Sequence, residues 1–295
     1  MTISELKIEF KRALSALYSE SESAELFYIF AHHIIGLDKF QLRKFSHQTV
    51  LQQDEEALKH IISELKTGKP YQYILGTAEF YGCSFFVNEH TLIPRPETEE
   101  LLEFAIEKIH NRWDNKEKQF NSAENNSKLN FRILDIGTGS GIIPIVLKKH
   151  FPNADITAID ISEQALEIAR KNAEYHQTPI RFIQQDYLHS TLEENYDIII
   201  SNPPYIGQNE ADEIAPSVKG FEPVSALFSP TTDPLIFYRK IAQDGEKHLR
   251  EKGMIFLEIN QKLGKETLDL FQNFPEKQLL KDLSSNDRII YAGKE

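Results

Sequence analysis

Four consecutive residues, Asn202-Pro203-Pro204-Tyr205, follow a predicted β-strand and are candidates for a ligand-binding site. They follow Ser201 and the apolar, β-branched run 196–200, which is typical of a buried parallel strand. Each proline fixes its own φ and restricts the residue before it, so the segment after the strand is stiff and extended. Ligands of open α/β sheets bind beyond the carboxyl ends of the strands. The sequence therefore predicts an Asn amide and a Tyr ring at a binding site.

A glycine-rich loop, Asp135-Ile136-Gly137-Thr138-Gly139-Ser140-Gly141, follows another predicted strand and opens a predicted helix. Glycines there let the backbone approach a ligand closely. Asp160 ends the next predicted strand roughly 20 residues further on, where a carboxylate can bind two ribose hydroxyls. The loop is not the dinucleotide fingerprint G-x-G-x-x-G, because Ile142 holds its last position, and no Lys-Ser/Thr follows as in a P-loop.

The length and composition of the chain limit the classes of protein to which it can belong. Its 295 residues suggest two domains, and Cys83 is the single cysteine, which excludes a disulfide framework and a zinc site of thiolates. The net charge of −12 makes a protein or a small molecule a better expectation than nucleic acid as substrate. No signal-peptide core and no apolar run of about 18 residues is present, so we expect a cytoplasmic protein and no membrane segment.

The first 75 residues are predicted to be a helical bundle. Ser23 is a candidate cap for a second helix that ends at Gly36, a short segment follows at 38–46, and another helix is predicted over 55–66. The core-facing positions predicted for the first helix share a helical spacing. They are Ile3, Leu6, Phe10, Leu14 and Leu17.

A change of period at residues 76–93 predicts a β-hairpin that turns near Tyr81-Gly82 or near Asn88-Glu89. Pro96 suits the first position of the helix that follows, and the polar stretch 113–128 is predicted to be a mobile surface insertion. These patterns divide the chain into a helical domain (1–75), a hairpin linker (76–93) and a second domain (94–295).

From residue 131 onward, strands and helices alternate, which predicts a mostly parallel sheet with helices on both faces. The predicted strands are 131–136, 155–159, 180–183, 197–200, 253–259 and 288–292, and the predicted helices are 142–150, 162–169, 233–249 and 264–271. No room remains for a helix after the last strand. The two late strands are therefore predicted to form an antiparallel edge pair.

The glycine loop, Asp160, Asp186 and the Asn-Pro-Pro-Tyr segment together resemble the Rossmann-like methyltransferases that use S-adenosylmethionine. The resemblance implies a class I methyltransferase fold. It implies that the glycine loop passes the methionine part of the cofactor and that Asp160 binds the ribose. It also implies that Asp186 and Tyr187 flank the adenine. Asn-Pro-Pro-Tyr is the signature of those members that methylate a planar, conjugated nitrogen.

That signature suits the chemistry of an amide or exocyclic amino nitrogen, whose lone pair is delocalised and whose two N–H groups need two fixed acceptors. Asn202 offers its side-chain oxygen, and Pro203 offers a carbonyl with no N–H of its own to compete. Both acceptors would stabilise the positive charge that develops on nitrogen. Tyr205 can stack on the planar group. No general base and no metal are expected, since the methylated nitrogen can lose its proton to water.

The chain resembles the release factor glutamine methyltransferases almost from end to end. Besides the helical region and the two motifs above, the resemblance rests on segments 70–76, 80–82, 95–99, 221–223, 226–227, 258–259 and 286–288. It implies methylation of the glutamine amide in the Gly-Gly-Gln motif of bacterial class 1 peptide release factors, with a helical domain that helps to bind the factor. The chain departs from the family at Asn260, where a glycine is common.

Two other classes of function are weighed against this one. A nucleic-acid amino methyltransferase, acting on ribosomal RNA guanine-N2 or DNA adenine-N6, shares the tetrapeptide but should carry a basic recognition surface, and we do not expect direct nucleic-acid binding. A non-catalytic nucleotide-binding module would keep the glycine loop but would have no use for Asn202 with Tyr205.

Overall fold

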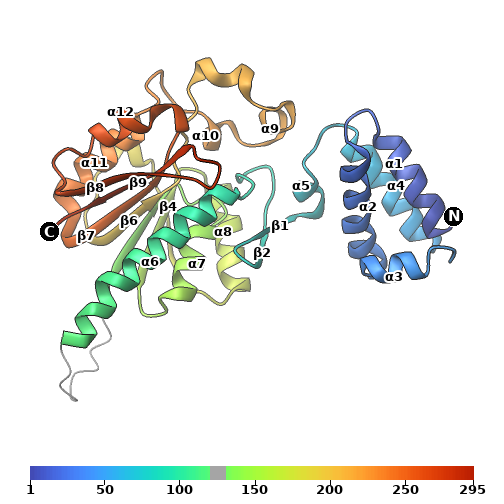
Figure 1. Ribbon diagram of the computed structural model, residues 1–295, viewed down its shortest axis with the longest axis horizontal. Coiled ribbons are helices and arrows are strands. Elements are labelled where there is room, and N and C mark those ends of the chain that lie inside the picture. Colours follow the sequence, from blue (N-terminus) through green and yellow to red (C-terminus); the bar gives the residue numbers. More distant parts are fainter. Residues whose placement is uncertain (120–130) are drawn as a thin grey trace. The chain divides into compact units, whose positions relative to one another are not determined.

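Five helices precede the first strand, so the change of period near residue 76 marks a change of architecture (Figure 1). The computed structural model describes residues 1–119 and 131–295, apart from the side chains of residues 113–119 and 208. It divides into two units, Met1–Gly76 with Ala215–Phe221, and Thr77–Ile214 with Glu222–Glu295. Within the described ranges, every helix is too short or too polar to span a membrane.

The helical unit is a bundle whose apolar stripes meet in one core. Its first five helices are α1 (Ile3–Leu14), α2 (Glu20–Ile35), α3 (Lys39–Lys44), α4 (Gln52–Leu65) and α5 (Tyr71–Leu75). The residues predicted to face the core from α1 are buried, with the exception of Leu17. Leu17 lies beyond the end of α1 and is 55% exposed, so its predicted core position is wrong. The short helix α5 was not predicted.

The start of α2 differs from the prediction, because Ser19 and not Ser23 caps it. Ser19 Oγ accepts a hydrogen bond from Glu22 N at 3.2 Å, and the Glu22 carboxylate accepts one from Ser19 N at 2.8 Å. This reciprocal pair is a capping box, whose Ser-x-x-Glu spacing is present in the sequence. Ser23 is buried inside the helix. Gly36 ends α2 with a φ of 77°, as predicted.

The predicted hairpin is confirmed, and it turns at the first of the two proposed positions. It consists of β1 (Thr77–Phe80) and β2 (Cys83–Phe86), joined by Tyr81 and Gly82. Helix α6 (Pro96–Gln119) begins at Pro96, as predicted, and the backbone of residues 113–119 continues it. The backbone of residues 113–119 is therefore helical, which the sequence did not predict for this polar stretch. Residues 120–128 lie outside the described part of the chain.

A seven-stranded sheet forms the centre of the second unit, in the order β5-β4-β3-β6-β7-β9-β8 (Figure 1). Neighbours from β5 to β7 are parallel, as predicted. The strands are β3 (Arg132–Ile136), β4 (Asp155–Asp160), β5 (Arg181–Gln184), β6 (Tyr196–Ser201), β7 (Leu249–Glu258), β8 (Glu276–Lys281) and β9 (Asp287–Gly293).

The predicted antiparallel pairing of the two late strands, β7 and β9, is confirmed. The edge of the sheet, however, is β8, which the sequence did not predict and which pairs with β9 on its other side. Its side chains are exposed or half-buried along the whole strand. An edge strand of this kind lacks the alternation of apolar and polar residues that identifies a half-buried strand.

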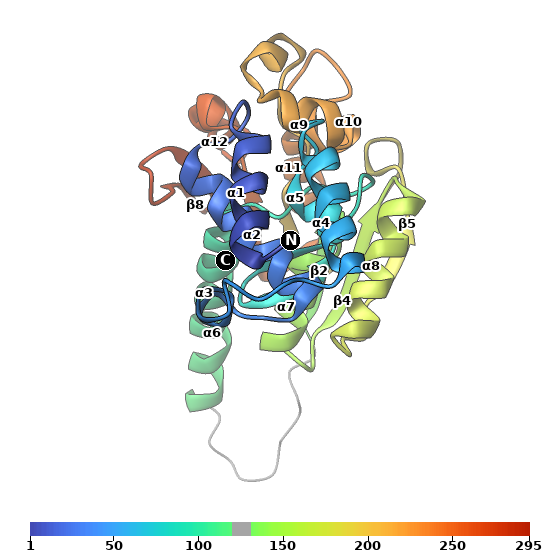
Figure 2. The same cartoon turned by 90° about the vertical axis from the view of Figure 1, so that its right-hand side faces the viewer.

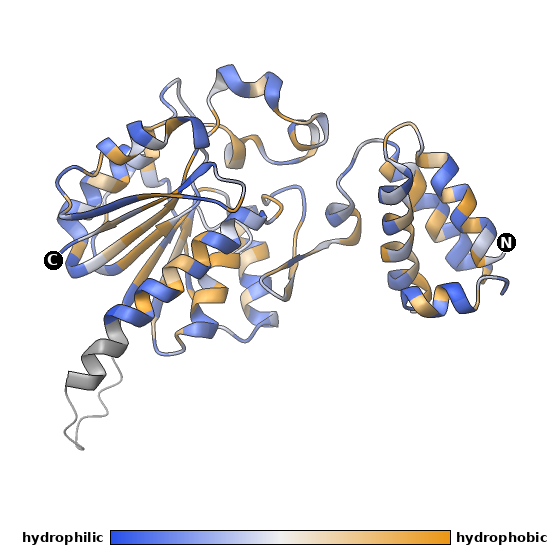
Figure 3. Ribbon diagram, viewed as in Figure 1, coloured by the Kyte–Doolittle hydropathy of each residue, from blue (hydrophilic) through white to orange (hydrophobic). Residues whose placement is uncertain are grey.

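Helices cover both faces of the sheet, whose central strands are largely apolar (Figure 3). The remaining helices are α7 (Ile142–His150), α8 (Glu163–Tyr175), α9 (Pro216–Phe221), α10 (Val224–Leu227), α11 (Ile236–His248) and α12 (Gly264–Asp269), with short 3₁₀ turns η1 (Tyr187–His189), η2 (Gln208–Glu213) and η3 (Gln261–Leu263). One core packs α6, α7 and the hairpin against the sheet, and another packs α11 on its opposite face. Figure 2 shows α8 alongside β4 and β5.

Candidate active site

The carboxyl ends of β3, β4 and β6 lie side by side at the same end of the sheet, because the three strands are parallel neighbours. Ile136 of β3 is paired with Ile159 of β4 and with Ser201 of β6. The residues that come next in the chain are the glycine loop, Asp160 and Asn202. The fold therefore brings together three predicted features that are far apart in the sequence.

The glycine loop is tied to the end of β4 by its own backbone. Gly137 N and Thr138 N both donate to Ile159 O, at 2.9 and 3.0 Å. Gly137 has a φ of 74°, and a Cβ added there would meet no atom within 4 Å, so the backbone is open to a ligand. Gly141 has a φ of 81°, and a Cβ there would lie 3.1 Å from Ala169 Cβ on α8. Glycine is thus required at Gly141 by close packing.

Asp160 is held rigidly at the end of β4. Its Oδ2 accepts a hydrogen bond from Gly139 N at 2.8 Å, and its Oδ1 accepts one from Ser162 N at 2.9 Å. Burial raises the pKa of Asp160, although these backbone N–H groups oppose the rise. A carboxylate has about four acceptor positions, so both oxygens can still accept hydrogen bonds from hydroxyl groups in the cavity that the residue lines.

Asp135 and Thr138 are neighbouring buried polar residues. Both carboxylate oxygens of Asp135 and the Thr138 hydroxyl make no hydrogen bond within the part of the chain that the structure describes. Burial raises the pKa of Asp135 to about 7; the Thr138 hydroxyl opposes this rise and the charge of Asp160 adds to it. Such unsatisfied groups are costly in a folded protein and often mark a binding site.

Asp186 and Tyr187 follow β5 and line the same cavity. Asp186 caps η1, with Oδ1 accepting from Leu188 N at 3.1 Å, and its Oδ2 lies 2.8 Å from His189 Nδ1. The hydrogen bond with His189 lowers the pKa of Asp186. The Tyr187 hydroxyl donates to Asp244 Oδ2 at 2.8 Å and is buried. Its phenol oxygen is therefore engaged in the interior, and the ring is the part left for contact with a flat ligand.

Asn202 is oriented by a side chain from α6. Its Nδ2 donates to Thr98 Oγ1 at 3.1 Å, and Thr98 Oγ1 in turn donates to Glu258 Oε2 at 2.6 Å. The Tyr205 hydroxyl donates to the other oxygen, Glu258 Oε1, at 3.3 Å. Burial raises the pKa of Tyr205, and the neighbouring Glu258 carboxylate adds to the rise. Tyr205 is thus a neutral hydrogen-bond donor with its hydroxyl in the interior.

One cavity of about 920 Å³ contains most of the predicted site. The predicted residues that line it are Gly137, Thr138, Ser140, Asp160, Asp186, Tyr187, Asn202 and Pro204. The other predicted residues are absent from its lining, and they are Asp135, Gly139, Gly141, Pro203 and Tyr205. A volume of this size falls within the usual range for ligand pockets.

Curated relatives match the chain along almost its whole length. It is 41% identical to the release factor glutamine methyltransferase of Flavobacterium psychrophilum, covering 98% of each chain. It is 36% identical to those of Bacteroides thetaiotaomicron, covering 96% of this chain and 97% of the relative, and Streptococcus pneumoniae, covering 98% of each. The chain belongs to the release factor glutamine methyltransferase family.

Two parts of this methyltransferase also match domain families. Residues 5–76 match the PrmC N-terminal domain, and residues 119–217 match the methyltransferase small domain. Solved structures support the fold. A methyltransferase from Pyrococcus furiosus aligns with a TM-score of 0.50 at 17% identity, covering 79% of this chain and 98% of that one. The hMettl16 catalytic domain aligns with a TM-score of 0.51 at 20% identity, covering 72% and 75%.

S-adenosylmethionine is the methyl donor of this enzyme, and the residues present fit it. Asp160 presents both carboxylate oxygens at a strand end, which suits the two ribose hydroxyls. The unpartnered Thr138 hydroxyl lines the cavity beside the open backbone of Gly137, which suits a polar ligand passing close to the loop. Among the described residues, no group of three or more His, Cys, Asp or Glu side chains could hold a metal ion.

Thr98 and Glu258 are residues of the site whose contacts were not predicted from the sequence. Both lie in segments that carry the family resemblance, yet 160 positions separate them in the chain. The departure at Asn260 also has a structural role, since its Nδ2 donates to Tyr205 O at 3.3 Å and to Glu210 Oε1 at 3.0 Å. Asn260 thereby anchors the backbone at the end of the Asn-Pro-Pro-Tyr segment.

An ion pair between Arg95 and Glu222 was also not predicted. Arg95 Nη2 donates to Glu222 Oε1 at 2.6 Å, and Glu222 Oε2 accepts from Ile93 N at 3.1 Å. The Glu222 side chain is only 1% exposed, whereas Arg95 lines the cavity. The pair joins the segment before α6 to the segment after α9. Its only signal in the sequence was the presence of both residues in family motifs.

Proposed function

We propose that the protein methylates the side-chain amide nitrogen (N5) of the glutamine in the Gly-Gly-Gln motif of class 1 peptide release factors. The observation that carries this proposal is the orientation of Asn202. Its amide nitrogen is engaged by Thr98 Oγ1 at 3.1 Å, so its amide oxygen is left to accept a hydrogen bond from a substrate. The names of the curated relatives support the same substrate.

A glutamine amide needs such acceptors because its nitrogen lone pair is delocalised into the carbonyl. Asn202 Oδ1 and the Pro203 carbonyl would each accept one N–H of the substrate, which holds the nitrogen in place and stabilises the positive charge that develops on it. When bound, S-adenosylmethionine supplies a methyl group on a sulfonium. The rate then depends mainly on in-line positioning, for which the stiff Asn-Pro-Pro-Tyr segment is suited.

Removal of the last proton requires no dedicated base. The methylated nitrogen is cationic and acidic enough to lose its proton to water. The buried carboxylate of Glu258 accepts hydrogen bonds from Thr98 and Tyr205 on its two oxygens and so is occupied. We therefore assign the catalytic contacts to Asn202, Pro203, Pro204 and Tyr205, and assign no residue as a general base.

The helical unit is proposed to bind the release factor outside its glutamine motif. The match of residues 5–76 to a domain family separate from the methyltransferase domain supports this division of roles. The net charge of −12 favours a protein partner over nucleic acid. A release factor as substrate would place the reaction in the cytoplasm.

The test is methyl transfer from labelled S-adenosylmethionine to three separate acceptors: a release factor, ribosomal RNA and DNA. We expect label on the release factor alone, and no label on a matched factor whose motif glutamine is changed to alanine. Label on nucleic acid alone, or equal label on both factors, would overturn the proposal. The nucleic-acid alternative is not favoured, since relatives that cover nearly the full chain are named as glutamine methyltransferases.

A further inference from the structure

Glu258, the last residue of β7, contacts Tyr205 directly and Asn202 through Thr98, so its buried carboxylate connects two residues of the Asn-Pro-Pro-Tyr segment. It is 1% exposed, and its two oxygens accept from Thr98 Oγ1 at 2.6 Å and from the Tyr205 hydroxyl at 3.3 Å. We propose that Glu258 and Thr98 are positioning residues, which together determine that the amide oxygen of Asn202 faces the substrate. This inference rests on the proposed function, because it concerns the acceptor for the substrate amide.

The donors and acceptors around Thr98 determine which end of the Asn202 amide faces it. A threonine hydroxyl has one hydrogen to donate, and an ionised carboxylate can only accept. Because Thr98 gives its hydrogen to Glu258, it can only accept from Asn202. Asn202 must therefore turn its NH₂ group toward Thr98 and its oxygen away from it. Asn202 with its amide reversed would place two acceptors, Oδ1 and Thr98 Oγ1, against each other.

The second oxygen of Glu258 holds the side chain of Tyr205 in place. That oxygen accepts the phenol hydrogen, which fixes the hydroxyl end of the ring. The backbone carbonyl of Glu258 accepts from the Tyr238 hydroxyl at 3.1 Å, and Tyr238 is fully buried on α11. The strand end that carries the carboxylate is therefore itself held in place. Rigid support of this kind is what a precisely placed acceptor requires.

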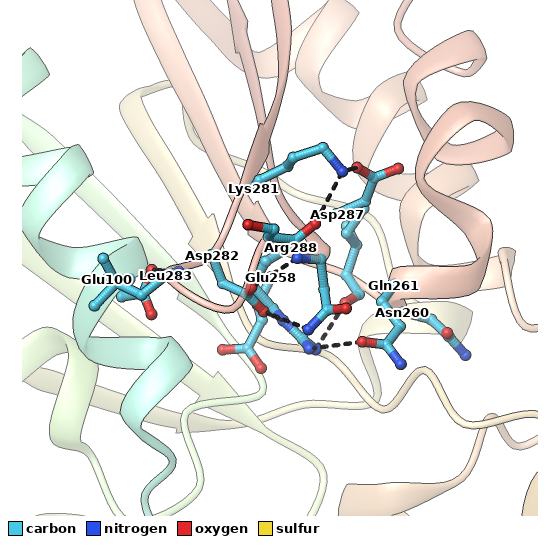
Figure 4. Close-up of polar contacts among 12 residues, drawn as sticks. Glu100, Glu258, Asn260, Gln261, Lys281, Asp282, Leu283, Asp287 and Arg288 are labelled. Atoms are coloured by element: carbon cyan, nitrogen blue, oxygen red, sulfur yellow. Dashed lines mark hydrogen bonds and ion pairs between the residues drawn. The ribbon is translucent and has the colours of Figure 1, made fainter.

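A buried carboxylate is costly unless a positive charge lies nearby, and Arg288 supplies one (Figure 4). Burial raises the pKa of Glu258, while the hydrogen bond from Thr98 and the charge of Arg288 oppose the rise. Arg288 is fixed by Asp282, whose Oδ2 accepts from Arg288 Nε at 3.1 Å, and by Gln261, whose Oε1 accepts from Nη2 at 3.4 Å. Arg288 thus favours the ionised, accept-only form of Glu258.

The first experiment compares Thr98→Val with Thr98→Ser in the full-length protein, with a release factor as acceptor. Thr98→Val removes the hydroxyl but keeps the shape, and we expect kcat to fall by about 10-fold or more, as for loss of a charge-assisted hydrogen bond. Thr98→Ser keeps the hydroxyl and should restore kcat to within about 3-fold of wild type. The dissociation constant of S-adenosylmethionine, measured by calorimetry, should stay within about 3-fold in both.

A matched control is Thr267→Val on α12. Thr267 is fully buried, and its Oγ1 donates to Leu263 O at 2.7 Å, so this substitution also removes one buried hydroxyl and one hydrogen bond. We expect it to lower the melting temperature without changing kcat. If Thr98→Val does not fold, Thr98→Ala serves in its place. An equal loss of kcat in Thr267→Val would mean that general destabilisation, and not positioning, explains the effect, and would overturn the inference.

A double-mutant cycle separates action through Asn202 from an independent effect. If Thr98 acts by orienting Asn202, then Thr98→Val should cost no further activity in an Asn202→Ala background, measured in single-turnover reactions. Glu258→Ala should also lower kcat, because Thr98 then loses the acceptor of its hydrogen and is free to donate to Asn202. Full activity of Thr98→Val, or additive losses in the cycle, would overturn the inference. Wild-type protein that leaves the factor unmethylated would instead overturn the proposed function.

Discussion

Gly139 and Asp160 are joined across two parallel strands by a hydrogen bond of 2.8 Å from the glycine N–H to carboxylate Oδ2. The glycine loop that follows β3 and the carboxylate that ends β4 are therefore one rigid structure. The second oxygen of Asp160 accepts from Ser162 N at 2.9 Å, which ties in the cap of α8 as well. A ligand that binds the carboxylate is consequently held at a fixed distance from the loop.

Asp160→Ala should weaken the binding of S-adenosylmethionine by about 10- to 100-fold, the usual effect of losing hydrogen bonds to a charged group. Calorimetric titration measures this directly. The matched control is Asp155→Ala at the opposite end of the same strand, where the residue is exposed and is not part of the cavity. An unchanged dissociation constant in Asp160→Ala would show that this carboxylate does not bind the ribose.

Asn202→Ala should lower kcat for glutamine methylation by about 10²- to 10³-fold, because it removes one of two acceptors for the charge that develops on nitrogen. The dissociation constant of the cofactor should change much less than kcat, since binding of the cofactor rests mainly on the glycine loop and Asp160. Steady-state kinetics with a release factor measure the first quantity, and calorimetry measures the second. The control substitution is Asn153→Ala. Asn153 is exposed and precedes the amino-terminal end of β4, at the end of the strand opposite Asp160. Wild-type kcat in Asn202→Ala would contradict the proposed geometry.

Asn172→Ala should destabilise the second unit by about 3 kcal/mol, as it leaves buried backbone groups without partners. Asn172 is fully buried on α8. It accepts from Phe86 N at 2.7 Å and donates to Phe86 O at 3.0 Å and Ser140 O at 2.8 Å. Urea denaturation measures the loss in the free energy of unfolding.

The control for that experiment is Asn273→Ala, which removes one exposed hydrogen bond, to Glu246 at 2.8 Å. We expect it to change the free energy of unfolding by less than about 0.5 kcal/mol. Because Asn172 joins the hairpin to the glycine loop, its replacement should also weaken cofactor binding. Equal stabilities of the two variants would contradict the role assigned to Asn172.

The strands whose carboxyl ends line the cavity could be predicted, because each is apolar and ends at a polar residue. Asp160 and Asn202 were found in this way, and the parallel order brings them together. The edge strand β8 could not be found, since its side chains are mostly exposed and carry no periodic signal. Ser23 was mistaken for a cap because it precedes the apolar run, although Ser19 has the better spacing to a glutamate.

The contact between Thr98 and Glu258 could not be predicted for a different reason. The two residues lie at the start of a helix and at the end of a strand, 160 positions apart. The sequence around each residue gives no indication of the other residue as its partner. The position of β7 beside β6 follows only from the strand order of the folded sheet. The sequence could therefore predict residues that line the cavity, such as Asp160 and Asn202, but not the residues that orient Asn202.

Asp135 should make the cofactor-free protein less stable as the pH rises from about 4 to about 7, compared with Asp135→Asn. Burial raises the pKa of Asp135 to about 7, well above its ordinary value of 3.8. Between these two values the folded protein keeps a proton that the unfolded chain has released, so this carboxyl reduces the free energy of unfolding as pH increases. The slope is at most about 1.4 kcal/mol per pH unit.

The measurement is the free energy of unfolding of wild type and Asp135→Asn at a series of pH values. The difference between the two curves isolates this one group, because the other titrating residues are common to both proteins. We expect the advantage of Asp135→Asn to grow up to about pH 7 and then to level off. Parallel curves for wild type and Asp135→Asn would mean that Asp135 is already ionised in the folded protein, with a partner for its charge.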